Sequence, residues 1–270
     1  MWAQCPHRWK TAYIDGHREF SDNIHTLFGT SMHEVIQTFL TVMYNDTAKM
    51  AEALPLEDML LTRMKRNFES VLETNGGEMF CTEKDMVEFY QHGVEILKFI
   101  RKKRAQYFSK KGYELIGIEV PLNYDLRNNV KFVGYIDIVI RDTVRDVIKI
   151  YDIKTSTMGW NKWMKADKLK SDQLLLYKQF YAKQYNHPIE KIEVEFFIVK
   201  RKLYENTEFP QKRIQKFIPA NGKPSINKVL HRLEAFMTEC YDEDGSIKHN
   251  DYEKCHPKSK CKAFTKCKDL

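Results

Sequence analysis

The 270-residue sequence contains no run of 18 consecutive apolar residues, although 43% of its residues are hydrophobic. A helix needs about 20 apolar residues to cross a bilayer, so no membrane span is predicted. The first ten residues already carry polar and charged groups, which argues against a secretory signal. The sequence therefore favours a cytoplasmic protein with a real buried core, and no membrane partner.

The sequence also lacks the pattern G-x-x-x-x-G-K-[ST], the loop that cradles nucleotide phosphates. The chain is therefore not itself a helicase or ATPase, and any unwinding of a nucleic acid must come from a helicase or recombination partner. No internal repeat or low-complexity linker occurs, so we expect a single domain over residues 1–270.

The charge balance is only modestly basic. Lys plus Arg is 44 and Asp plus Glu is 37, which gives a net charge of +7. The basic residues cluster, however, at positions 101–104, 110–111 and 200–202. Such clusters fit a polyanionic partner, but solvated helix faces and strand ends explain any single cluster equally well.

The pattern of apolar residues predicts a mixed α/β domain. In the first third, an amphipathic helix is expected from Thr30 to about Tyr44, with Ser31 and Glu34 spaced as a capping box. Helices are also expected over 56–72, 83–107, 167–185 and 226–241. Val, Ile and Tyr dominate 114–122, 131–141 and 147–155, which predicts a three-strand antiparallel meander, with a later strand at 192–201. The helical region is thus 28–111, and the core is 112–241.

Charged residues interrupt these apolar strands. Asp137 lies in the middle of the second strand, and Asp152 and Lys154 are two apart in the third, so they share one face of the sheet. Glu119 lies in the first strand. An Asp–Lys salt bridge explains any one of these residues about equally well. Several clustered buried charges favour a working site instead, and hard oxygen ligands suit Mg²⁺ or Mn²⁺.

Here a family resemblance becomes specific. The segment Gly134-Tyr135-Ile136-Asp137, followed about fifteen residues later by Asp152-Ile153-Lys154-Thr155, resembles the core of RecB-type PD-(D/E)XK nucleases. The G-x-x-x-H helix of that family is matched by Gly29 to His33, and its Q-x-x-x-Y helix by Gln173 to Tyr177. Glu119 stands where the family often has a glutamate. The resemblance implies a restriction-endonuclease-like core, a mixed central β-sheet flanked by helices, and the activity of a metal-dependent DNA nuclease.

The resemblance also assigns roles to the site. Asp137 and Asp152, the Ile153 carbonyl and His33 would hold the divalent ion, and Lys154 would orient or deprotonate the attacking water. We expect His33 in the first turn of its helix, where the macrodipole disfavours a charged imidazole.

Further residues are candidates for contact with DNA. Gln173 and Tyr177 share one helical face and would reach over the site or the DNA backbone, although ordinary helix packing explains their spacing equally well. Trp160 and Trp163 alternate with lysines and could stack on bases of a single strand, or pack against the sheet edge. Arg101 begins the basic run 101–104, which we expect to line a tunnel under the helical region.

Relatives with both helix motifs act mostly on single-stranded ends. The resemblance therefore implies a single-strand-preferring exonuclease of DNA recombination, repair or replication, and a phage exonuclease is one such type. A catalytically idle DNA-binding scaffold and a structure-specific endonuclease are the alternatives.

Six cysteines stand at positions 5, 81, 240, 255, 261 and 267. Their crowding near the C-terminus does not resemble a disulfide framework and suits a metal or cluster site in a reducing compartment. Cys5-Pro6-His7-Arg8-Trp9 resembles the start of the iron–sulfur members of the family, which include AddB and the CRISPR-associated adaptation nucleases.

That resemblance implies a four-iron, four-sulfur cluster that joins the two ends of the chain, with the ligands Cys5, Cys255, Cys261 and Cys267. The tail spacing C-x5-C-x5-C departs from the common C-x-x-C-x5-C, which leaves Zn²⁺, or His256 as a substitute ligand, open. Cys81 and Cys240 are expected to be plain core residues.

Overall fold

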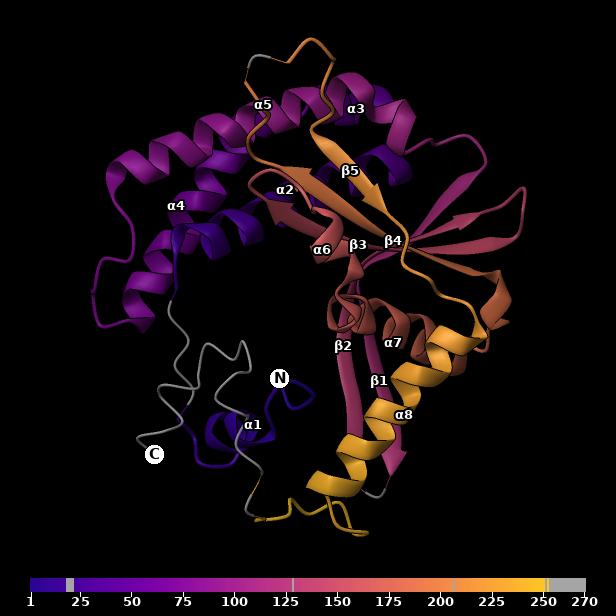
Figure 1. The fold of residues 1–270 in the computed structure, drawn as a ribbon. Coiled ribbons are helices and arrows are strands. Elements are labelled where there is room, and N and C mark those ends of the chain that lie inside the picture. The colour runs from indigo at the N-terminus through magenta and orange to yellow at the C-terminus, as the bar shows by residue number, and fades with distance from the viewer. Residues whose placement is uncertain (18–21, 128, 206, 251, 253–270) are drawn as a thin grey trace. The chain divides into compact units, whose positions relative to one another are not determined.

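The fold was analysed in a computed structural model, which describes residues 1–17, 22–127, 129–205, 207–250 and 252 (Figure 1). The chain forms two compact units. The larger unit comprises Asp22–Leu122 and Val133–Asn221, and the smaller comprises Met1–Ser21, Asn123–Phe132 and the chain from Gly222 onward. Within the described part of the chain, no helix is both long enough and apolar enough to cross a membrane.

A five-stranded mixed sheet organises the larger unit. Its strands follow the order β1-β2-β3-β4-β5. Their bounds are β1 Tyr113–Arg127, β2 Val130–Asp142, β3 Val147–Ser156, β4 Ile192–Lys200 and β5 Ile214–Phe217. The pairs β2–β3 and β4–β5 are antiparallel, whereas β3 and β4 are parallel. A parallel pair needs a crossover connection, and this one contains α6 (Lys162–Ala166), α7 (Lys168–Gln184) and the 3₁₀ turn η1 (Ile189–Lys191).

Four helices cover one face of this sheet. They are α2 (Ile24–Asn45), α3 (Ala48–Glu52), α4 (Leu56–Thr74) and α5 (Glu83–Tyr107), and they gather on one side of β3, β4 and β5 (Figure 1). Their apolar side chains form one core cluster with residues of the sheet such as Ile138, Tyr151 and Ile153. Lys154, which follows Ile153 on β3, lies instead beside Gln173 of α7.

The smaller unit has its own apolar centre. It contains α1 (Pro6–Tyr13) and α8 (Lys223–Cys240), and Trp9, Cys240 and Tyr252 form the buried cluster. The Trp9 ring lies edge-on to Tyr252, with 5.5 Å between the ring centroids. Cys240 is fully buried, as expected for a core cysteine, whereas Cys81 is only half-buried.

The predicted mixed sheet with flanking helices is confirmed, and α4 and α5 lie close to their expected positions. The predicted start of the first long helix was wrong. Helix α2 begins at Ile24, and a capping box between Asn23 and Thr26 satisfies its first backbone N–H groups. Ser31 is therefore inside the helix, where its hydroxyl donates to the Leu27 carbonyl at 2.9 Å. Sequence analysis also missed the short elements α1, α3, α6 and β5.

Candidate active site

Strand β3 carries the two charged residues at the centre of the candidate site. Asp152 and Lys154 lie on one face, as their spacing predicts. The Lys154 ammonium lies 2.7 Å from Oδ2 and 3.0 Å from Oδ1 of Asp152. The Asp152 side chain is 2% exposed, whereas that of Lys154 is 35% exposed. The carboxylate is thus buried beneath an ammonium group that reaches solvent.

Asp137 lies where β2 and β3 separate. The antiparallel ladder ends at the pair Ile138 and Tyr151, and the next step along the register would place Asp137 opposite Asp152. At this step the Asp137 side chain makes the hydrogen bond to β3, since its Oδ2 accepts from the Ile153 amide at 2.6 Å. The Asp137 carboxylate is thereby fixed against the backbone of the strand that carries Asp152.

Helix α2 contributes His33 and Gln37, one turn apart. His33 Nδ1 lies 3.7 Å from Oδ2 of Asp137. The Gln37 amide donates to Glu119 Oε1 at 2.5 Å and, more weakly, to the Asp137 carbonyl at 3.4 Å. Gln37 was missed by sequence analysis, and its position four residues after His33 was the available signal.

The backbone of β1 is distorted at Glu119. This residue has a φ of 49°, in the left-handed region that residues other than glycine rarely adopt. Such local irregularity re-aims a strand side chain. Here the Glu119 carboxylate meets Gln37, which is held in turn beside Asp137.

Helix α7 brings Gln173 and Tyr177 to the same site. Oε1 of Gln173 lies 3.5 Å from the Lys154 ammonium, and the Gln173 amide donates to the Tyr177 hydroxyl at 2.9 Å. A Cβ added to Gly134 would lie 2.9 Å from the Tyr177 ring. The glycine of the Gly134–Asp137 motif therefore allows the ring to approach β2 closely.

Burial controls the ionisation of these groups. It raises the pKa of Asp152 to about 6, against the partial opposition of Lys154, and it raises that of Asp137 to about 6 as well. Burial, and secondarily the charge of Lys154, lowers the pKa of His33 and favours a neutral imidazole. The expected cause was wrong, because His33 lies well inside α2 rather than in its first turn.

The donor chemistry of the site fits Mg²⁺ or Mn²⁺. Oδ2 of Asp152 is buried and accepts no hydrogen bond of good geometry, although the Lys154 ammonium lies close to it. Among the described residues, no three His, Cys, Asp or Glu side chains form a complete metal-binding group. Magnesium is commonly held by one or two carboxylates and several waters. The Asp137 and Asp152 carboxylates and the Ile153 carbonyl are oxygen donors of the type that such a site would use.

The two tryptophans proposed for base stacking have different surroundings. Trp160 is buried, its ring lies 4.8 Å from that of Phe196, and its backbone amide donates to Gln215. Of the two alternatives that the sequence left open for Trp160, these contacts favour packing against the sheet. Trp163 is 73% exposed, with the Lys162 ammonium 4.9 Å from its ring centroid, so it is free to contact a ligand.

The basic run that begins at Arg101 holds helices together. Arg101 donates to the Leu54 carbonyl at 2.7 Å and lies 3.6 Å from Glu57. Arg104 lies 3.0 Å from Glu52. Both arginines brace α5 against α3 and α4. Their role in lining a tunnel stays a prediction.

Of the four cysteines expected to bind a cluster, Cys5 alone can be placed. It is buried at the start of α1, where its Sγ accepts from the Arg8 amide at 3.4 Å. Cys255, Cys261 and Cys267 lie outside the described residues.

Acidic side chains on two adjacent strands, next to a lysine, define a site of the metal-dependent nuclease class. A family model described as the PD-(D/E)XK nuclease superfamily matches residues 2–268. The chain therefore belongs to this superfamily, whose nucleases typically use Mg²⁺ or Mn²⁺ and act on DNA. No curated protein matches the chain.

Proposed function

We propose that the chain is a Mg²⁺- or Mn²⁺-dependent deoxyribonuclease of the RecB-like branch, and that it is an exonuclease with a preference for single strands. Its expected setting is DNA recombination, repair or replication, where a partner would supply unwinding. The observation that carries the proposal is the meeting of Asp137, Asp152 and Lys154 on adjacent strands, with His33 beside them.

The residues of the site divide the work of hydrolysis. A divalent ion, when bound, polarises the phosphoryl oxygen and lowers the pKa of a coordinated water. Asp137, Asp152 and the Ile153 carbonyl would hold this ion, with His33 as a further ligand. Lys154, anchored by Asp152 but open to solvent, would orient the attacking water and offset the negative charge that grows on the phosphoryl oxygens.

Gln173 and Tyr177 support this lysine. The Gln173 side chain bridges the Lys154 ammonium and the Tyr177 hydroxyl, so it limits the positions that the ammonium can take. Precise placement of this kind is a large part of catalysis. We assign Gln173 as a positioning residue and Tyr177 as a contact to the DNA backbone. Exposed Trp163 is the remaining candidate for base stacking.

The preference for strand ends predicts a sharp difference between two substrates. The proposal rests on the His33 helix and the Gln173–Tyr177 helix, because relatives with both act mostly on single-stranded ends. In Mg²⁺, the protein should degrade a linear single strand and leave the same sequence intact when it is closed into a circle. A blunt duplex of that sequence should be cut more slowly. Equal cleavage of the circle would instead identify an endonuclease.

We also propose that Cys5, Cys255, Cys261 and Cys267 bind a four-iron, four-sulfur cluster, with Zn²⁺ as the alternative. The support is the buried thiol of Cys5, together with the family resemblance of its surroundings. The purified protein should contain roughly four irons and four sulfides per chain. Cys5→Ser should lose them and lower thermal stability, whereas Cys81→Ser should keep them. A metal analysis that finds one zinc and no iron per chain would contradict the cluster and favour Zn²⁺.

A further inference from the structure

A surface pocket lies between α2, α4 and β1 of the larger unit. Its volume is about 410 Å³, within the range typical of ligand sites. It is lined by Ile118 and by six residues with polar groups: Glu34, Gln37, Thr38, Thr41, Arg63 and Arg66. Two guanidinium groups face a single carboxylate, so the pocket carries an excess of positive charge.

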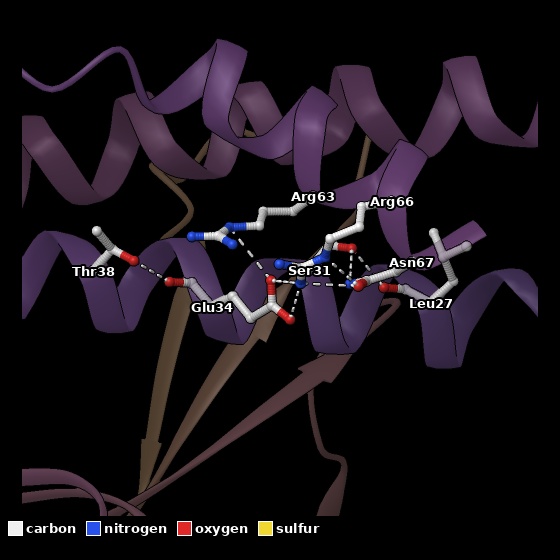
Figure 2. Close-up of polar contacts among 7 residues, drawn as sticks. All are labelled: Leu27, Ser31, Glu34, Thr38, Arg63, Arg66 and Asn67. Atoms are coloured by element: carbon white, nitrogen blue, oxygen red, sulfur yellow. Dashed lines mark hydrogen bonds and ion pairs between the residues drawn. The ribbon is translucent and has the colours of Figure 1, made fainter. Parts of the chain in front are cut away.

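Glu34 holds both guanidinium groups at the pocket. Nη2 of Arg66 lies 2.6 Å from each carboxylate oxygen of Glu34. Arg63 meets the same carboxylate more loosely, with its Nε 3.4 Å from Oε2. Within the described residues, Arg63 forms one ion pair, the contact with Glu34. Figure 2 shows its guanidinium extending past that carboxylate. The terminal nitrogens of Arg63 are thus free to donate to an anion.

A chain of hydrogen bonds fixes the position of Arg66 (Figure 2). Its guanidinium donates to Oδ1 of Asn67 at 3.0 Å, and the Asn67 amide donates to the Ser31 hydroxyl at 3.0 Å. Ser31 is fully buried and donates in turn to the Leu27 carbonyl. An arginine that is already ordered loses less conformational entropy when it binds a ligand.

Gln37 connects this pocket to the catalytic carboxylates. Its side chain lines the pocket and also donates to Glu119 and to the backbone of Asp137. Glu34 directly follows His33 in α2, so the helix presents one residue to the pocket and the other to Asp137. An anion in the pocket would therefore lie next to a phosphate bound at Asp137.

We propose that this pocket binds a phosphate group of the DNA strand, adjacent to the phosphate that is cut. The inference rests on the proposed nuclease function and names the part of the site that holds the substrate. Arg63 and Arg66 would supply forked donors, which suit phosphate geometry. The Thr38 and Thr41 hydroxyls line the same pocket but donate to the Glu34 and Gln37 carbonyls. In the absence of DNA, Glu34 occupies Nη2 of Arg66, so it competes with the phosphate for that donor.

A simple brace between α2 and α4 is the competing explanation, and the two make opposite predictions for Glu34→Gln. This variant removes the competing negative charge, so it should bind a single strand several-fold more tightly. If Glu34 served only to hold the helices together, its loss would lower the melting temperature and would not improve binding. Affinity is measured by fluorescence anisotropy of a labelled single strand in EDTA, where cleavage does not occur.

Arg63→Gln should weaken binding of the same strand about 10-fold, because a charge-assisted contact to phosphate is lost. The slope of log affinity against log salt concentration should fall by about 1. Arg145→Gln is the matched control. Arg145 is also an exposed arginine paired with a glutamate, Glu193, but it lies at the β2–β3 turn, the far end of this hairpin from Asp137. Its affinity and salt slope should match those of the wild type.

Whether the bound phosphate is internal or terminal is tested by measuring the affinity for three forms of the strand. These forms carry a 5′-phosphate, carry a 5′-hydroxyl, or are circular. An equal loss for Arg63→Gln on all three identifies an internal phosphodiester, and a loss confined to the phosphorylated end identifies a terminal monoester. Wild-type affinity and salt slope in Arg63→Gln would overturn the inference. A failure of the proposed function is distinguishable, because it would appear as wild-type protein that binds but does not cleave.

Discussion

Asp152→Asn is expected to reduce the rate of DNA cleavage about 1000-fold, and Lys154→Ala about 100- to 1000-fold, while both variants still bind DNA. The asparagine has the size of the aspartate but not the charge that a divalent ion needs. The alanine removes the ammonium that lies 2.7 Å from Asp152 and reaches solvent at the site. Single-turnover cleavage of an end-labelled single strand measures the rate, and anisotropy in EDTA measures binding.

Lys149→Ala provides the matched control for the lysine variant. Lys149 belongs to the same strand, but it pairs with Glu193 at 3.5 Å, near the other end of β3. Its cleavage rate should stay within about twofold of the wild type, because surface pairs contribute little. Wild-type rates in Asp152→Asn or Lys154→Ala would remove these residues from the catalytic site.

Asp152→Asn should also make the metal-free protein more stable at pH 7.5, by on the order of 2 kcal/mol. Burial raises the pKa of Asp152 to about 6, above its ordinary value of 3.8, so the folded state binds this proton more tightly than the unfolded state. The ionised carboxylate therefore destabilises the fold above pH 6. This destabilisation shrinks as the pH falls below 6, and it is absent below about pH 3.

Urea denaturation of wild type and variant in EDTA, at pH 7.5 and at about pH 3, tests this sign. The gain at pH 7.5 should vanish at about pH 3, where the wild-type carboxyl is largely protonated in both states. Added Mg²⁺ should stabilise the wild type and reduce the difference, because the ion binds only the folded protein. A loss of stability in the variant at pH 7.5 would show that the Asp152–Lys154 pair serves the fold, as a structural salt bridge does.

The part of the site that lies on one hairpin could be predicted from sequence. The alternation of side chains along a strand places Asp152 beside Lys154 whatever packs around them. The apolar pattern also located α4 and α5, because their periodicity is long and regular. These features depend on residues close together in the chain.

The contacts between distant elements could not be predicted. Gln37 meets Glu119 only because α2 packs next to a distorted β1, and no local pattern signals that distortion. Trp160 and Arg101 both have basic residues nearby in the sequence, which suits DNA binding. In the fold, however, Trp160 packs against Phe196 of the sheet, and Arg101 donates to the Leu54 carbonyl between α3 and α4. Residue type alone does not decide between a ligand contact and a packing contact.

The measurement that tests the central claim most directly is incubation of the purified chain with an end-labelled linear single strand of DNA, in Mg²⁺ or Mn²⁺ and in EDTA. We predict that labelled short products accumulate with either ion and that EDTA stops their formation, because Asp137 and Asp152 need a cation to act on phosphate. DNA that stays intact with both ions would contradict nuclease activity. Cleavage at the same rate in EDTA would contradict the role assigned to these two carboxylates.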